Sequence, residues 1–123
     1  MNRFLFFTAI FVIVMATLVV MHLEDINTRT VVEVVDGDTL VLDDGTTVRL
    51  ARVDAPEWDE QGGQAAESQL RELTLHREVR LESDPDQPKE DRYGRTIAYV
   101  FVGEQNVNEA LIEDGYADEW EPW

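Results

Sequence analysis

The sequence has no cysteine and only one lysine, Lys89, and both features limit what the chain can do. Without cysteine, neither disulfide bonds nor thiolate metal sites are available. The 123 residues carry 26 acidic against 10 basic side chains, a formal net charge of −16. Proteins that bind nucleic acid over a broad surface usually show a basic patch, so the composition argues against that mode of binding. The acidity fits adaptation to high salt, or simply a solvated acidic surface.

Charged side chains are also missing from one long apolar run over residues 4–21. As a helix the run would be about 27 Å long, close to the roughly 30 Å hydrocarbon core of a bilayer. A cleaved signal peptide has an apolar core of about 7–15 residues and a small-residue cleavage site. The run is longer, and residues 19–22 offer no such site. An uncleaved signal anchor is therefore favoured over a signal peptide.

The charges that flank this run predict its orientation. Arg3 precedes it, and positive residues next to a membrane segment stay in the cytoplasm, whereas Glu24 and Asp25 after it have little influence. We expect a single-pass protein of the cell membrane with its globular domain outside; a secreted protein is the alternative. The expected division is a signal anchor or signal peptide over residues 1–22, a polar linker over residues 23–29 and one globular domain over residues 30–123.

The globular part predicts a mainly β fold of the α+β class. Runs rich in β-branched residues, separated by turn residues such as Asp43-Asp44-Gly45, indicate strands. Helices are indicated by a 3.6-residue apolar period and by Gly115, which stands where a helix C-terminal glycine would. The expected strands cover residues 30–35, 39–42, 46–53, 78–82 and 96–102, and the expected helices cover residues 64–76 and 107–114.

Three short stretches concentrate carboxylates and arginines: residues 35–39, 48–57 and 91–95. Asp38 begins an expected strand, and Asp54 and Glu57 follow the end of another. If these strand ends meet, the three carboxylates converge within reach of one ion, and oxygen clusters of this kind bind calcium. Arg49 and Arg95 lie near the same ends, and guanidinium groups pair with phosphate oxygens while staying charged.

These stretches resemble staphylococcal nuclease and its homologues. The resemblance rests on Asp-Gly-Asp-Thr at residues 36–39, Arg-Leu followed by Val-Asp-x-Pro-Glu within residues 49–57, and Asp-x-Tyr-Gly-Arg at residues 91–95. A fourth motif, Val-Asn-Glu-Ala-Leu with later Gly and Ala, lies within residues 107–117. Four motifs in one order cover nearly all of the globular part. The resemblance implies a five-stranded OB-fold barrel with one helix between strands three and four and a short C-terminal helix.

The resemblance also implies a calcium-dependent nuclease that acts on DNA or RNA. We expect it to be a monomer with no organic cofactor. Arg49 and Arg95 would contact the scissile phosphate, and Glu57 would position or deprotonate the attacking water. Metal ligands would come from Asp38, Asp54 and the backbone carbonyl of Ala55. Tyr93 and Arg92 would bind substrate; the family's usual lysine is replaced by Arg92.

Two other function classes remain open beside the nuclease. One is a barrel that binds nucleic acid or protein without cleaving it, which the complete set of site residues argues against. The other is a membrane-tethered interaction domain, which is supported only by the apolar run over residues 4–21 and by the acidity of the chain. Trp58 either fills the interior of its loop or contacts the substrate. Trp120 and Trp123 are the aromatic residues near the C-terminus that could stack on a base, although covering the barrel surface is the favoured interpretation.

Overall fold

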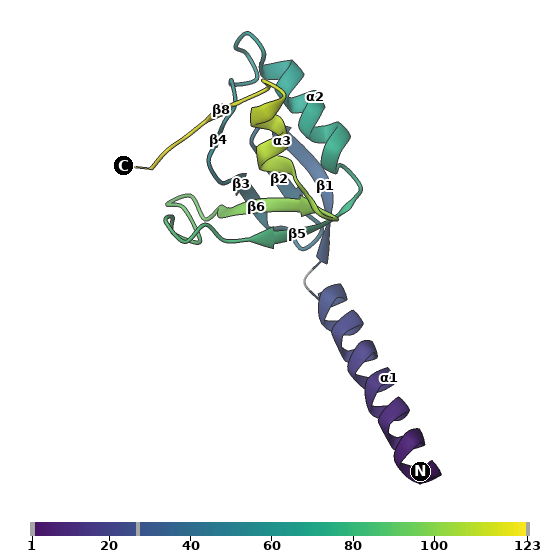
Figure 1. Ribbon diagram of the computed structural model, residues 1–123. Coiled ribbons are helices and arrows are strands. Elements are labelled where there is room, and N and C mark those ends of the chain that lie inside the picture. The colour runs from purple at the N-terminus through teal and green to yellow at the C-terminus, as the bar shows by residue number, and fades with distance from the viewer. Residues whose placement is uncertain (1, 27, 123) are drawn as a thin grey trace.

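A computed structural model describes residues 2–26 and 28–122, and only the backbone of residues 20–26. The N-terminal run forms helix α1 (Arg3–Ile26), which extends away from the rest of the chain in Figure 1. Among the described residues, no helix meets the length and apolarity that a bilayer crossing requires. The linker expected over residues 23–29 is shorter, because α1 continues to Ile26 and the first strand begins at Thr28. No proline or glycine interrupts residues 23–26 to end the helix earlier.

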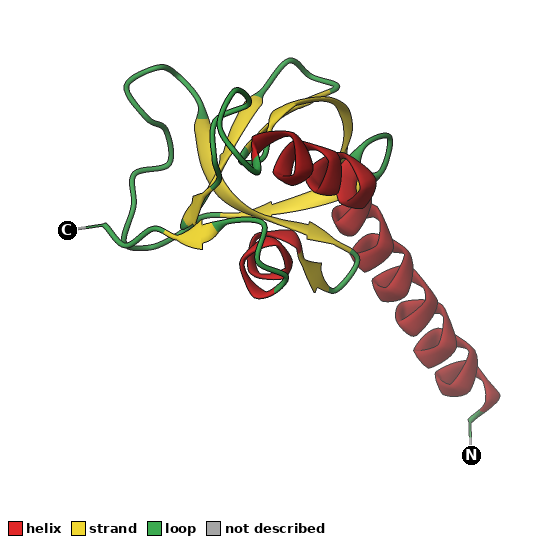
Figure 2. Cartoon of the chain, turned by 90° about the horizontal axis from the view of Figure 1, so that it is seen from above, coloured by secondary structure: helices red, strands yellow, loops and turns green. Residues whose placement is uncertain are grey.

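Five strands form a closed barrel: β1 (Thr28–Asp36), β2 (Thr39–Leu42), β3 (Thr47–Leu50), β5 (Glu78–Glu82) and β6 (Thr96–Val102). The order is β3-β2-β1-β5-β6 with antiparallel neighbours, and a parallel pairing of β3 with β6 closes the ring. Figure 2 shows the strands curving around a common centre with the shorter helices against them. The expectation of a five-stranded barrel of the OB type is confirmed.

The third strand differs from its expected course over residues 46–53. It divides into β3 and β4 (Val53–Asp54), because the chain turns at Ala51 and Arg52. Arg52 adopts a φ of 64°, in the left-handed region that a strand does not use. Two further short strands were not expected, β7 (Gln105–Asn106) and β8 (Asp118–Glu119). β8 pairs with β4, so the C-terminal segment lies directly beside Asp54.

Two helices cover the barrel. In α2 (Gly63–Thr74), Ala66 and Leu70 are fully buried and Leu73 packs against the core, as the apolar period predicts. In α3 (Val107–Glu113), the Asn106 side chain accepts a hydrogen bond from the N–H of Glu109 at the N-terminus. Gly115, with φ 80°, follows the C-terminal cap of α3, so the expected terminating glycine is confirmed.

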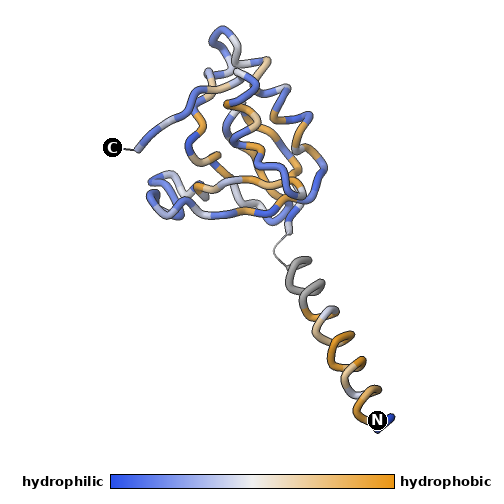
Figure 3. Tube along the Cα trace, in the orientation of Figure 1, coloured by the Kyte–Doolittle hydropathy of each residue, from blue (hydrophilic) through white to orange (hydrophobic). Residues whose placement is uncertain are grey.

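The core consists of aliphatic side chains that the strands and the helices α2 and α3 direct inward, while polar segments form the outer surface (Figure 3). Its largest fully buried members are Val31, Leu40, Leu42, Val48, Leu50, Val53, Leu70, Val79, Val100, Val107 and Leu111. Strands β2 and β3 contribute Leu40, Leu42, Val48 and Leu50 from alternate positions. The intervening residues, Arg49 among them, therefore point out of the core.

Candidate active site

The first site segment is the tight turn between β1 and β2, which carries Asp36, Gly37 and Asp38. A Cβ atom on Gly37 would lie 2.6 Å from the Cβ of Ala66 and 2.8 Å from the Cβ of Ala55. Only glycine fits this close approach, which seats the turn against α2 and against the segment that follows β4. The turn also buries Asp38, which is only 8% exposed. Gly37 therefore has a packing role that positions Asp38.

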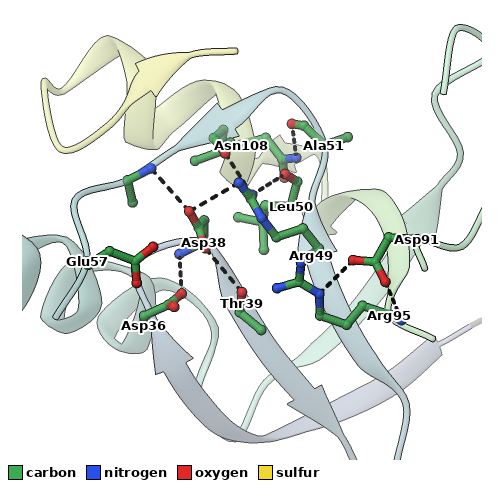
Figure 4. A network of polar contacts seen from close by, with 12 residues as sticks. Asp36, Asp38, Thr39, Arg49, Leu50, Ala51, Glu57, Asp91, Arg95 and Asn108 are labelled. Carbon is green, nitrogen blue, oxygen red and sulfur yellow. Dashed lines mark hydrogen bonds and ion pairs between the residues drawn. The ribbon is translucent and has the colours of Figure 1, made fainter. Parts of the chain in front are cut away.

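Asp38 is held by polar contacts from several elements (Figure 4). Its Oδ2 accepts a hydrogen bond from the N–H of Ala55 at 3.2 Å and lies 3.3 Å from Nη2 of Arg49. The Thr39 hydroxyl donates to Asp38 Oδ1 at 3.1 Å. Burial, together with the neighbouring Asp36 carboxyl, raises the pKa of Asp38 to about 6 against the opposing effect of Arg49. A cation beside this carboxylate would offset the cost of burying its charge.

Arg49 lies on β3, opposite Thr39 of β2, with its guanidinium turned toward Asp38. One nitrogen, Nη1, donates to two backbone carbonyls, those of Leu50 at 3.0 Å and Val53 at 2.7 Å. The turn between β3 and β4 brings both carbonyls to the same nitrogen. The other terminal nitrogen, Nη2, faces Asp38, so the orientation of the guanidinium is fixed on two sides.

Arg95 reaches the same side of the barrel from a different segment. The parallel pairing aligns Arg49 with Ile97, and Arg95 precedes Ile97 by two residues after a turn at Gly94, whose φ is 79°. Asp91 binds both the backbone N–H of Arg95 at 3.0 Å and its Nε at 2.6 Å. Although burial raises it, these hydrogen bonds hold the pKa of Asp91 below its usual value. Figure 4 shows the Arg95 and Arg49 side chains on the same side of the barrel.

Tyr93 and Arg92 stand at the rim of this site. Nη2 of Arg92 donates to the Tyr93 hydroxyl at 2.7 Å. The Tyr93 ring is 68% exposed, and the guanidinium groups of Arg92 and Arg95 lie 4.9 and 5.5 Å from its centre. The hydroxyl and the two arginines thus form an exposed, positively charged group suited to a phosphate.

The expected convergence of Asp38, Asp54 and Glu57 on one ion is not seen as a three-residue cluster among the described side chains, and their metal role stays a prediction. Among the side chains that the structure describes, those of residues 2–19 and 28–122, no three carboxylates or histidines stand close enough together to share a metal. Asp54 is exposed where β4 pairs with β8, whereas Glu57 lies beyond Pro56 in an exposed loop. Hydrogen bonds between Glu57 and Glu60 shape this loop.

The oxygen donors on the β1–β2 turn and on the segment at β4 still suit a calcium ion. Asp38 contributes a buried carboxylate, and its bond to the N–H of Ala55 places it against the segment that carries Asp54 and the Ala55 carbonyl. Calcium accepts carboxylates, backbone carbonyls and waters in a flexible shell of six to eight oxygens. Asp38, Asp54 and Ala55 would therefore hold the ion with water completing the shell.

Sequence reasoning assigned no role to two residues that shape the site, Asp91 and Asn108. Asn108 is 1% exposed, and its side chain donates to the carbonyls of Ala51 and Ala98 and accepts from the N–H of Val100. Both residues lie inside motifs that were recognised, but a buried amide or an Arg-binding carboxylate is visible only once the partner strands are placed.

A small pocket of about 200 Å³ opens beside Arg49. It is lined by Arg49, Leu50, Arg52, Val53, Gln87, Ile97 and Trp120. Among the described residues, the buried oxygen Oε1 of Gln87 has no hydrogen-bond partner. Trp120 thus lines a pocket next to the site. Trp58 is 59% exposed, so its side chain does not pack into the interior of its loop. Trp123 lies outside the described residues.

Comparison with known proteins agrees with this geometry. Residues 47–122 match the family described as Staphylococcal nuclease homologue, so the chain belongs to the staphylococcal nuclease family. It is similar to the thermonuclease of Staphylococcus hyicus, with 40% identity over 100 residues that cover 73% of this chain and 57% of the relative. An uncharacterized endonuclease of Haemophilus influenzae is 38% identical over 95 residues, covering 74% of this chain and 51% of the relative. The chain spans about half the length of these relatives.

Proposed function

We propose that the chain is a calcium-dependent nuclease that hydrolyses phosphodiester bonds of DNA or RNA. The observation that carries the proposal is the placement of Arg49 on β3 and of Arg95, just before the parallel strand β6, on one side of the barrel with the buried carboxylate of Asp38 beside Arg49. Relatives named thermonuclease and endonuclease support the same activity. No organic cofactor is needed for this chemistry, and we expect the protein to act as a monomer.

Each site residue would have a distinct role in phosphodiester hydrolysis. Arg49 and Arg95, held by the Val53 carbonyl and by Asp91, would bind the phosphate and stabilise the charge that develops on it during displacement. Removing one such preorganised donor typically costs about 10²–10³-fold in rate. Glu57 would accept the proton of the attacking water. When bound, calcium supplies a Lewis acid for a phosphate oxygen.

The wider substrate surface would come from the rim and the pocket. Tyr93 and Arg92 offer a hydroxyl and a guanidinium to a neighbouring phosphate. The pocket beside Arg49 has an indole wall, Trp120, and an amide, Gln87, which suits an unstacked base.

A digestion assay with purified protein tests the proposal. Plasmid and single-stranded DNA and RNA should be cleaved in calcium at high micromolar to millimolar levels and not in excess chelator. Magnesium should support less turnover, because it demands tighter octahedral geometry. The alternative is a barrel that binds nucleic acid without cleaving it; retarded migration with no cleavage at any calcium concentration would favour that alternative.

We further propose that residues 4–21 anchor the chain in the cell membrane with the nuclease domain outside; secretion is the alternative. The apolar run supports this, as does the exposure of the described side chains of α1, none of which packs into the barrel core. Protease added to intact cells should remove the domain from a tethered protein. Complete protection, with activity in the cytosolic fraction, would refute the topology and leave the nuclease proposal standing.

A further inference from the structure

The bend between β3 and β4 determines where the Arg49 guanidinium can sit. The carbonyls of Leu50 and Val53 flank this bend, and both accept from Nη1 of Arg49. A change in the shape of the bend would separate the two carbonyls. The guanidinium would then lose the orientation that turns its other nitrogen toward Asp38.

Arg52 lies at the centre of the bend in an unfavourable backbone conformation. Its φ of 64° is in the left-handed region, where a side chain is disfavoured and glycine is not. An arginine in this conformation requires contacts that compensate for the strain. The Arg52 side chain makes such contacts.

The compensating contacts form a partly buried ion pair with Asp84, in the loop that follows β5. Nε of Arg52 donates to Asp84 Oδ2 at 2.6 Å, and Nη2 lies 3.2 Å from Oδ2 of Asp86. Asp84 is only 4% exposed, and its carboxylate also accepts from the Asp86 N–H and the Tyr99 hydroxyl. The hydrogen bond from Arg52 is the main reason that the pKa of Asp84 is low. The pair therefore differs from an exposed surface ion pair, which contributes little.

Backbone groups of the bend also form hydrogen bonds with other elements. The Ala51 N–H donates to the Ala98 carbonyl, and the Ala51 carbonyl accepts from Asn108. The Arg52 carbonyl accepts from the N–H of Trp120. These bonds tie the bend to β6, α3 and the C-terminal segment, and the Arg52 side chain adds the tie to the loop after β5.

We propose that Arg52 is a positioning residue: by binding Asp84, it holds the bend in the shape whose carbonyls orient Arg49 on the phosphate. Its effect on turnover rests on the proposed nuclease function. The competing explanation is that the Arg52–Asp84 pair stabilises the barrel and has no influence on catalysis.

The main test is the double variant Arg52→Gly/Asp84→Asn. It removes the ion pair, leaves no unpaired buried carboxylate, and relieves the left-handed strain, so the chain should fold. The control is Arg29→Ala/Asp44→Asn, which removes a 2.9 Å ion pair remote from Arg49. With saturating calcium and substrate, well below the unfolding temperature, kcat should fall about 10- to 100-fold in the test variant. The control should stay within about twofold, and Arg52→Lys should lie in between. A folded test variant with wild-type kcat would overturn the proposal.

A second measurement separates positioning from a direct role. In an Arg49→Ala background, the same double substitution should lower kcat no further, because the residue through which it acts is gone. A further loss equal to that in the wild-type background would overturn the proposal.

Rotation of the Arg49 guanidinium, followed by ¹⁵N NMR in the full chain, should be faster in the double variant. This measurement does not depend on catalytic activity. If the wild-type protein fails to cleave nucleic acid, only the nuclease function is refuted. If the rotation of the Arg49 guanidinium is unchanged in the double variant, the positioning role of Arg52 is refuted.

Discussion

Replacing Asp38 by asparagine should stabilise the metal-free protein while abolishing calcium-dependent activity. Burial raises the pKa of Asp38 from 3.8 to about 6. Above neutral pH the folded protein therefore buries a charged carboxylate, which lowers the free energy of unfolding. A difference of about two pKa units corresponds to about 3 kcal/mol, since each unit is worth ~1.36 kcal/mol. Asparagine keeps an oxygen for the N–H of Ala55 and has no charge to bury. Chemical denaturation in chelator at pH 8 should therefore show a gain on the order of 2–3 kcal/mol.

The stability gained by Asp38→Asn should depend on pH. Because the folded-state pKa is raised, protonated Asp38 contributes stability that is fully present below pH 3.8 and lost as the pH rises through about 6. The advantage of the variant should thus be near zero below about pH 4 and complete above about pH 7. Calcium should stabilise the wild type and leave the variant unchanged. Asp43→Asn, at an exposed turn, is the control. A loss of stability for Asp38→Asn at pH 8 would refute the reasoning.

Three further outcomes are expected. Arg49→Ala and Arg95→Ala should each lower the cleavage rate by about 10²-fold or more with the fold retained, which circular dichroism and steady-state kinetics can check; a near-wild-type rate for Arg95→Ala would show that the phosphate site is wrong. Gly37→Ala should lower both stability and activity, because its Cβ would lie 2.6 Å from that of Ala66; equal thermal unfolding and kinetics would contradict the packing role. The Michaelis constant for DNA should fall several-fold as NaCl rises from about 0.05 to 0.5 M, because salt screens distant carboxylates over a Debye length of about 10 Å at 0.1 M; a steady rise would mean that phosphate contacts dominate.

The barrel was predictable from sequence because its signals are local. Alternating apolar residues place Leu40, Leu42, Val48 and Leu50 in the core, and turn residues mark the strand ends. The break at Arg52 was not predictable, since nothing in Arg-Leu-Ala-Arg-Val marks a left-handed residue. It depends on Asp84, 32 positions further along the chain. The short strands β7 and β8, of two residues each, carry too little pattern to be recognised.

The site was only partly predictable, for a similar reason. Motif spacing indicated that Asp38, Arg49 and Arg95 belong to one site, and the parallel pairing of β3 with β6 brings them to the same side of the barrel. The role of Glu57 stays a prediction: it lies in an exposed loop after Pro56, and Figure 4 shows its side chain turned toward Asp36 and Asp38. Strand ends fix the direction of a side chain, but a loop residue is placed by contacts that its own sequence does not specify.

The acidity of the chain and its proposed polyanionic substrate are compatible because they act over different distances. After Arg95 there is no basic residue and there are seven acidic ones, two of which, Asp118 and Glu119, pair with β4, the strand that carries Asp54. Such carboxylates repel a phosphate backbone over several ångströms and would attract a calcium ion. Arg49 and Arg95 act at contact distance, where salt screens little. Substrate capture would then depend on ionic conditions and calcium, while turnover would depend on how firmly the bend and Asp91 hold the two guanidinium groups.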